Sequence, residues 1–161
     1  MIKRSICFSV LLFAVGTFIL AERAQTQTTT PVYIQVTPAE VKWMPFPGLP
    51  PGAQIAVIYG NPTKPGLYVM LLKFPPNYKN PPHSHPVDQV ATVLSGTVYS
   101  GLGESFDSNK LKMFPAGSVY TEPLNTPHFT ETREEGVILQ VTGVGPVGTQ
   151  YVNPADDPRK K

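Results

Sequence analysis

The chain of 161 residues has one cysteine, Cys7, and no apolar run long enough for a typical membrane span. Cys7 lies inside the uncharged run Ile6–Leu20, which follows Lys3 and Arg4 as in a secretory signal. We therefore expect residues 1–24 to be a signal peptide and the protein to be exported, to the periplasm or outside the cell. An uncleaved N-terminal anchor is the alternative. Cleavage leaves no cysteine, which excludes disulfides, thiolate ligands and a cysteine nucleophile.

Charge is also sparse, because only 15% of the residues are charged. After removal of the signal peptide, ten basic and ten acidic residues remain, so the net charge is close to zero with histidine neutral. Such a chain has no basic patch of the kind that binds nucleic acid, and it has no membrane segment once the signal is cleaved. We expect a small molecule as its ligand or substrate, and a homodimer is possible.

Helical periodicity is missing after the signal, whereas the chain has 19 prolines and 13 glycines. Apolar, β-branched runs between these residues predict short strands joined by turns, arranged as a sandwich or barrel. Pro75–Pro82 is expected to be a loop, Ser95-Gly96 a hairpin turn, Phe106–Leu111 one helical turn and the tail an outer segment. The strands are expected at Val32–Val36, Val41–Met44, Ala53–Tyr59, Gly66–Phe74, Gln89–Leu94, Thr97–Leu102, Ser118–Glu122, His128–Thr132 and Val137–Thr142.

The chain has three histidines, and two of them are one residue apart. In an extended segment His83 and His85 point to the same side, and Gln89 has the same parity. The third, His128, follows the turn ending in Pro127. We predict that His83, His85, Gln89 and His128 surround one metal ion. The alternative is a solvated proline-rich loop in which the two neighbouring histidines bind nothing.

These residues resemble the two motifs of the cupin superfamily in every spacing. The first motif corresponds to Asn77, His83, His85, Gln89 and Gly96, and the second to Gly117, Pro123, Asn125, His128 and Thr132. The resemblance, closest to small exported single-domain cupins, implies an all-β, RmlC-like jelly-roll barrel with a divalent transition metal inside (iron, manganese, nickel, copper or zinc). It also implies a division into a signal peptide (1–24), a linker with edge strands (25–52), the barrel (53–145) and a tail (146–161).

The departures from the motifs are of two kinds. Asn77 and Asn125 replace glycines, and asparagine is the residue that best tolerates a left-handed turn after glycine. Thr132 replaces an asparagine that is not a ligand. Gln89 is different, because it replaces a glutamate ligand by a neutral amide. Asp88 has the wrong parity to take that place and is expected to face away.

Two functions fit these residues. One is a metal-dependent enzyme acting on a small organic substrate, in an oxygenase-type reaction; the other is a non-catalytic binding or sensor protein. An acid or base within reach of the metal would distinguish them. Glu122 and Glu131 are candidates for such a base, or ordinary surface carboxylates. Met and aromatic side chains are candidates for the cavity wall or for the core, namely Tyr68, Met70, Tyr99, Phe114 and Phe129.

Overall fold

The computed structural model describes residues 33–160, so the predicted signal peptide and residues 25–32 of the predicted linker lie outside the described residues. The described chain has four short 3-10 helices, η1 (Pro38–Glu40), η2 (Ser108–Lys110), η3 (Pro154–Asp156) and η4 (Pro158–Lys160). Its strands are β1 (Met44–Pro45), β2 (Gln54–Tyr59), β3 (Gly66–Phe74), β4 (Lys79–Ser84), β5 (Gln89–Leu102), β6 (Lys112–Pro115), β7 (Val119–Glu122), β8 (His128–Glu131), β9 (Val137–Gly145) and β10 (Gln150–Tyr151). None of its helices is long and apolar enough to cross a membrane.

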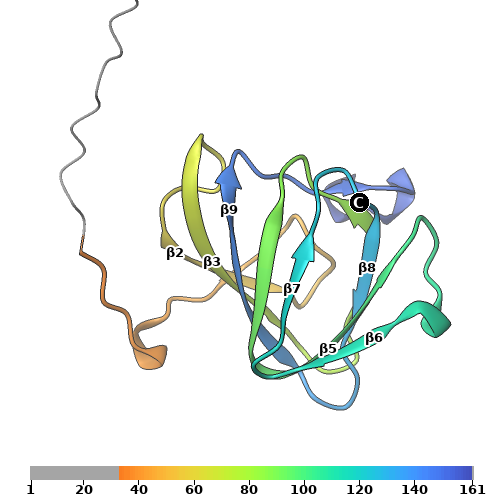
Figure 1. The fold of residues 1–161 in the computed structure, drawn as a ribbon, viewed down its shortest axis with the longest axis horizontal. Helices are drawn as coiled ribbons and strands as arrows, with labels where there is room; N and C mark the ends of the chain where they lie inside the picture. Colours follow the sequence, from red (N-terminus) through yellow and green to blue (C-terminus); the bar gives the residue numbers. More distant parts are fainter. Residues whose placement is uncertain (1–32, 161) are drawn as a thin grey trace, which may run out of the picture. The chain divides into compact units, whose positions relative to one another are not determined.

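Two antiparallel sheets share the long strand β5 and curl around a common interior (Figure 1). One sheet has the order β1-β2-β3-β9-β5-β7, and the other has the order β10-β4-β8-β5-β6. The first half of β5 lies between β9 and β7, whereas its second half lies between β6 and β8. This arrangement confirms the predicted all-β jelly-roll barrel.

The core follows from alternation along the strands. In β3 the buried residues Tyr68, Met70, Leu72 and Phe74 alternate with more exposed ones, because successive side chains of a strand point to opposite faces. The strand pairs with β9 over its whole length, and the inward residues of β9 complete the same layer. Burial of each of the Met, Leu, Phe and Val side chains in this layer contributes about 1.5–3 kcal/mol to stability.

The predicted hairpin at Ser95-Gly96 is wrong. Residues 89–102 form one strand, and the register with β9 shifts between Val93 and Ser95. Gly96 has a φ of 72°, and a side chain there would collide with the carbonyl of Gly136. The glycine therefore permits a bulge that bends β5 from one sheet into the other, rather than a turn that reverses it.

The predicted loop Pro75–Pro82 is also wrong in its second half, where Lys79–Ser84 forms β4. Its prolines are tolerated because the pairing with β8 shifts register between Asn80 and His83, so no donor is required there. The strand β6 was not predicted, and the helical turn expected at Phe106–Leu111 is confined to the three residues of η2.

The chain ends differ from the expectation as well. Residues 33–36 of the predicted first strand do not form a strand, and the predicted second strand, Val41–Met44, shares only Met44 with β1. The tail adds β10 to the edge of β4, and the Tyr151 hydroxyl donates a hydrogen bond to the carbonyl of Gly48 at 3.1 Å. The boundaries of the predicted linker, barrel and tail stay a prediction.

The two asparagines at the motif glycine positions have left-handed backbones. The φ angles are 55° at Asn77 and 51° at Asn125, the conformation that glycine adopts without strain and asparagine tolerates. The backbone N–H of Asn125 donates to the carbonyl of His85 at 2.8 Å. This turn thereby ties the segment before β8 to the end of β4, which brings the second motif beside the first.

Candidate metal centre

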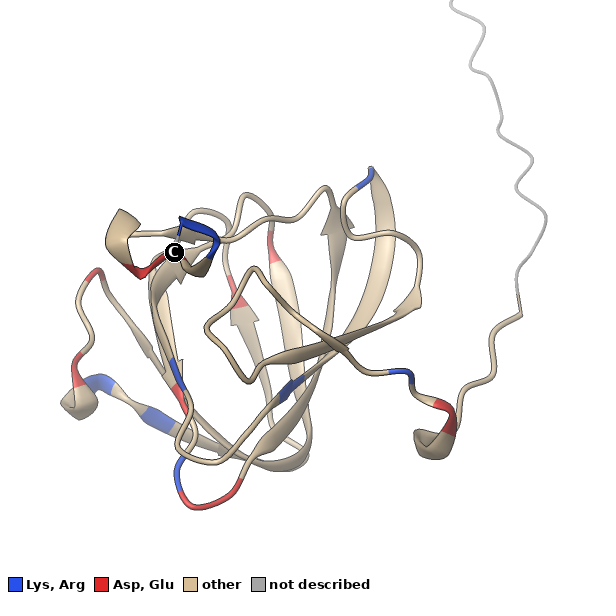
Figure 2. Ribbon diagram, turned by 180° about the vertical axis from the view of Figure 1, so that it is seen from behind, with Lys and Arg blue, Asp and Glu red and all other residues tan. Residues whose placement is uncertain are grey.

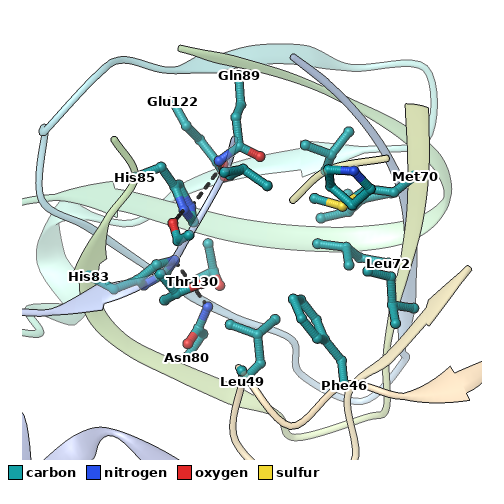
Figure 3. Close-up of a pocket in the computed structure, with 18 of the residues that line it drawn as sticks. Phe46, Leu49, Met70, Leu72, Asn80, His83, His85, Gln89, Glu122 and Thr130 are labelled. Atoms are coloured by element: carbon teal, nitrogen blue, oxygen red, sulfur yellow. Dashed lines mark hydrogen bonds and ion pairs between the residues drawn. The ribbon is translucent and has the colours of Figure 1, made fainter. Parts of the chain in front are cut away.

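The three histidines and Gln89 come from three strands that meet inside the barrel. His83 lies in β4 opposite His128, the first residue of β8, and His85 follows β4 directly. Gln89 is the first residue of β5. All four side chains are buried, and His83, His85 and Gln89 line one cavity (Figure 3).

The three imidazoles converge as their spacing predicts. One ring nitrogen from each histidine lies within 4.8 Å of those of the other two. The ring centroids of His83 and His128 are 4.3 Å apart, and His85 is 5.1 Å from His83 and 5.2 Å from His128. Such a cluster of buried histidines is positioned to bind one metal ion.

Backbone carbonyls fix the tautomer of all three rings. The Nδ1 atoms of His83, His85 and His128 lie 2.7, 2.8 and 3.0 Å from the carbonyl oxygens of Pro81, Gly148 and Thr126, respectively. A carbonyl only accepts, so each Nδ1 carries the proton and each Nε2 carries a lone pair. Metal-ligating histidines are held in this way by an acceptor on their other nitrogen.

The Nε2 atoms fit a metal because they have few other partners. The Nε2 of His128 is buried and has no hydrogen-bond partner, and that of His83 accepts only the side-chain amide of Asn80 at 3.2 Å. Burial lowers the pKa of His83 well below its ordinary value, and the neighbouring His128 and His85 lower it further. Burial also lowers the pKa of His85, although Glu122 opposes this shift. Low pKa values keep these imidazoles in the neutral form that ligates metals.

The sequence left two roles open for Glu122, a base near the metal or an ordinary surface carboxylate. Its Oε2 lies 3.6 Å from Nε2 of His85, and its Oε1 lies 3.6 Å from Nε2 of His128. The side chain is 13% exposed, so it is not a surface carboxylate. Burial raises the pKa of Tyr68 to about 12, and the charge of Glu122 adds to this effect. The sequence signal was only its position at the end of a predicted strand inside the second motif, directly before Pro123.

Other candidates lie elsewhere. Glu131 pairs with Lys79 and Arg133 at 4.0 and 3.1 Å, away from the histidines. Asp88 is exposed as predicted, and its carboxylate accepts the N–H of Leu124 at 2.9 Å. Of the five Met and aromatic candidates only Met70 lines the cavity, whereas Tyr68 and Phe129 are buried in the packed interior and Phe114 packs on the ring of Tyr120.

The cavity has a volume of about 350 Å³ and two unlike walls. Figure 3 shows His83, His85, Gln89 and Glu122 on one side and Phe46, Leu49, Met70 and Leu72 across from them. The C-terminal tail also reaches the cavity, because Thr149 and Arg159 line it. Figure 2 shows acidic and basic positions of the tail side by side near the C-terminus, where Arg159 is bonded to Asp157 at 2.7 Å. The arrangement suits a small molecule with a polar end and an apolar body.

Comparisons with known proteins agree with this fold. No family model matches the chain. Germin-like protein subfamily T member 2 from Arabidopsis thaliana is 31% identical over 103 residues, which cover 63% of this chain and 40% of that protein. The chain spans only 30 to 40% of the length of the germin-like relatives that it matches.

Solved structures give the same result. The polyketide cyclase RemF from Streptomyces resistomycificus superposes with a TM-score of 0.65 at 19% identity, covering 80% of this chain and 92% of RemF. An RmlC-like cupin from Shewanella frigidimarina superposes with a TM-score of 0.54 at 18% identity, covering 68% and 87% of the two chains. The antiparallel barrel of this chain therefore has the fold of RmlC-like cupins, and part of its sequence is similar to germin-like proteins.

Proposed function

We propose that this protein is a metal-dependent cupin enzyme that acts on a small organic molecule bound in the barrel. Its metal is a divalent transition ion such as iron, manganese, nickel, copper or zinc. The observation that carries this proposal is the arrangement of three buried imidazoles whose Nδ1 atoms are all held by carbonyls, with one ring nitrogen of each within 4.8 Å of those of the other two. Gln89 lies buried at the same cavity, and its amide oxygen is the proposed neutral fourth ligand.

The residues around the histidines define what the site can do. A bound divalent metal would polarise a substrate oxygen as a Lewis acid. The apolar wall of Leu49, Met70 and Leu72 then holds the hydrocarbon part of the substrate and excludes water. The volume of about 350 Å³ limits that substrate to a small molecule.

Glu122 favours an enzyme over a binding or sensor protein. The two functions differ in whether an acid or base stands within reach of the reacting atoms, and Glu122 lies 3.6 Å from two of the imidazole nitrogens. A carboxylate there accepts a proton from a substrate held against the histidines.

Metal content is the first test. Protein purified without a histidine tag and reconstituted separately with each of the five ions should bind one equivalent of at least one of them. The absence of binding to all five would overturn the proposal. Oxygen consumption with the loaded protein and candidate substrates would identify an oxygenase-type reaction, and binding without turnover of any substrate would identify the sensor alternative.

The apolar wall is tested with catechol, which combines two adjacent oxygens with an apolar ring. Catechol should bind to the Co²⁺-loaded protein and shift its visible absorption. Leu49→Trp, which fills the cavity from its buried wall, should weaken catechol binding by about tenfold, whereas Leu94→Trp on the exposed outside should not. Equal affinities of the two variants would place catechol outside the cavity.

Export is the last part of the proposal and rests on Lys3, Arg4 and the apolar run that follows them. N-terminal sequencing of the exported protein should begin near Glu22 or Gln25. A full-length precursor that remains soluble in the cytoplasm would contradict export without affecting the metal site.

A further inference from the structure

Glu122 lies beside two histidine nitrogens that cannot donate a hydrogen bond to it. The Nε2 atoms of His85 and His128 carry lone pairs, because both Nδ1 atoms donate to carbonyls. Each of these lone pairs faces an oxygen of Glu122, which also carries lone pairs when ionised. Acceptors that face one another repel unless a cation lies between them.

The distances identify what kind of cation fits. At 3.6 Å the nitrogen–oxygen pairs are longer than the usual hydrogen bond of about 2.9 Å. Two ligands that share one metal at about 2.1 Å each lie about 3.0–3.6 Å apart when the angle between them is 90–120°. From this geometry we infer that Glu122 is itself a metal ligand and takes the place of the carboxylate that the first motif lacks.

The strand register explains how the carboxylate can come from β7 instead of β5. Gln89 in β5 is paired directly with Glu122 in β7. Directly opposed residues of an antiparallel pair point to the same face of the sheet, with Cβ atoms about 5 Å apart. A carboxylate on either residue therefore enters the barrel at nearly the same point. In this pair β5 carries the glutamine and β7 carries the glutamate.

Charge balance supports the same assignment. No lysine or arginine among residues 33–160 forms an ion pair with Glu122, although Arg159 lines the same cavity, since Arg159 is bonded to Asp157. A carboxylate that is mostly buried requires a positive partner. Together with three imidazoles and the amide of Gln89, Glu122 leaves a six-coordinate ion one position for the substrate.

The test moves the carboxylate between the two strands, and it rests on the proposed metal site. Four proteins are compared by competitive titration with Co²⁺ at one pH, namely wild type, Glu122→Gln, Gln89→Glu/Glu122→Gln and Glu131→Gln. Glu131 is the matched control, because it is another buried carboxylate whose partners lie away from the histidines. The visible absorption of bound Co²⁺ reports on its ligands, and metal-free thermal unfolding shows that each variant is folded.

Glu122→Gln should bind Co²⁺ about tenfold more weakly than wild type and change its absorption spectrum. The double variant should regain an affinity within about threefold of wild type, and Glu131→Gln should change neither property. If Glu122→Gln binds Co²⁺ as tightly as wild type, or if the double variant does not recover, Glu122 does not replace the motif carboxylate. If wild type binds no Co²⁺, the three-histidine site itself is wrong, and this inference fails with it.

Discussion

His128 decides whether the two motifs share one metal, so its replacement by alanine is the most informative single change. His128 is the only one of the three histidines that comes from the second motif, and its Nε2 has no hydrogen-bond partner among the described residues. If it ligates the same ion as His83 and His85, its loss removes one of three imidazole ligands. A change of that kind is expected to weaken metal binding by about a hundredfold or more, since loss of even an outer partner of a ligand costs 10- to 100-fold.

The expected magnitude follows from the link between binding and stability. A metal present at about 100 times its Kd stabilises the folded state by about 2.7 kcal/mol. For the folded part of about 128 residues, this corresponds to a rise in Tm of about 8–13 °C. In His128→Ala the same concentration equals roughly one Kd, and the stabilisation falls to about 0.4 kcal/mol, or 1–2 °C.

The assay separates this effect from ordinary destabilisation. Replacing buried His128 also removes the hydrogen bond to the carbonyl of Thr126, so the metal-free variant melts lower than wild type. Val98→Ala is the matched control, because Val98 is fully buried in the core and does not line the cavity. It should lower the metal-free Tm but keep the full metal-induced rise. A His128→Ala protein that also keeps the full rise would refute a metal shared between the motifs.

Three further sets of measurements test the site and the core around it. Gln89→Glu should tighten metal binding by up to about tenfold, net of repulsion from Glu122, and Gln89→Ala should weaken it without abolishing it; equal affinities in competitive titration would exclude Gln89 as a ligand. The pKa of His83 in the folded protein lies below its ordinary 6.5, so just below pH 6.5 the unfolded chain binds more protons than the folded one. The free energy of unfolding of the metal-free protein should therefore fall as the pH drops below 6.5 and level off above it. A constant value from pH 5 to 8 would contradict this. Tyr68→Phe removes a buried hydroxyl without a hydrogen-bond partner and should leave stability unchanged or raise it by up to about 1 kcal/mol in urea unfolding, whereas Tyr78→Phe loses a bond to the carbonyl of Pro50 and should cost about 1 kcal/mol.

The sequence predicted the parts of the fold that depend on local alternation. Strand β3 was expected at the residues where it occurs, and β2, β7 and β8 were placed to within one residue at each end, because turn residues bound these runs of β-branched and aromatic residues. The errors arise where tertiary pairing overrides local signals. Two prolines in β4 suggested a loop, but a register shift removes the need for their missing donors. Ser95-Gly96 suggested a turn, but the same glycine permits a bulge within β5.

The same difference between local signals and tertiary pairing applies to the residues of the site. His83 and His85 converge because they belong to one extended segment, and the turn that contains Asn125 brings His128 beside them. These relations are short-range or carried by motif spacing. The proposed ligand Glu122 was not predicted, because its position depends on the pairing of Gln89 with a residue 33 positions later, which no linear spacing reports.

A carboxylate ligand has to lie near the metal in space, rather than at one sequence position, so either strand of a directly paired couple can supply it. A first motif without its glutamate would suggest a site weakened by the loss of a charge. The register between β5 and β7 leads to the opposite expectation, since the carboxylate of Glu122 lies on the same inward face as the amide of Gln89. A substitution at a ligand position is therefore best judged together with the residue that faces it across the sheet.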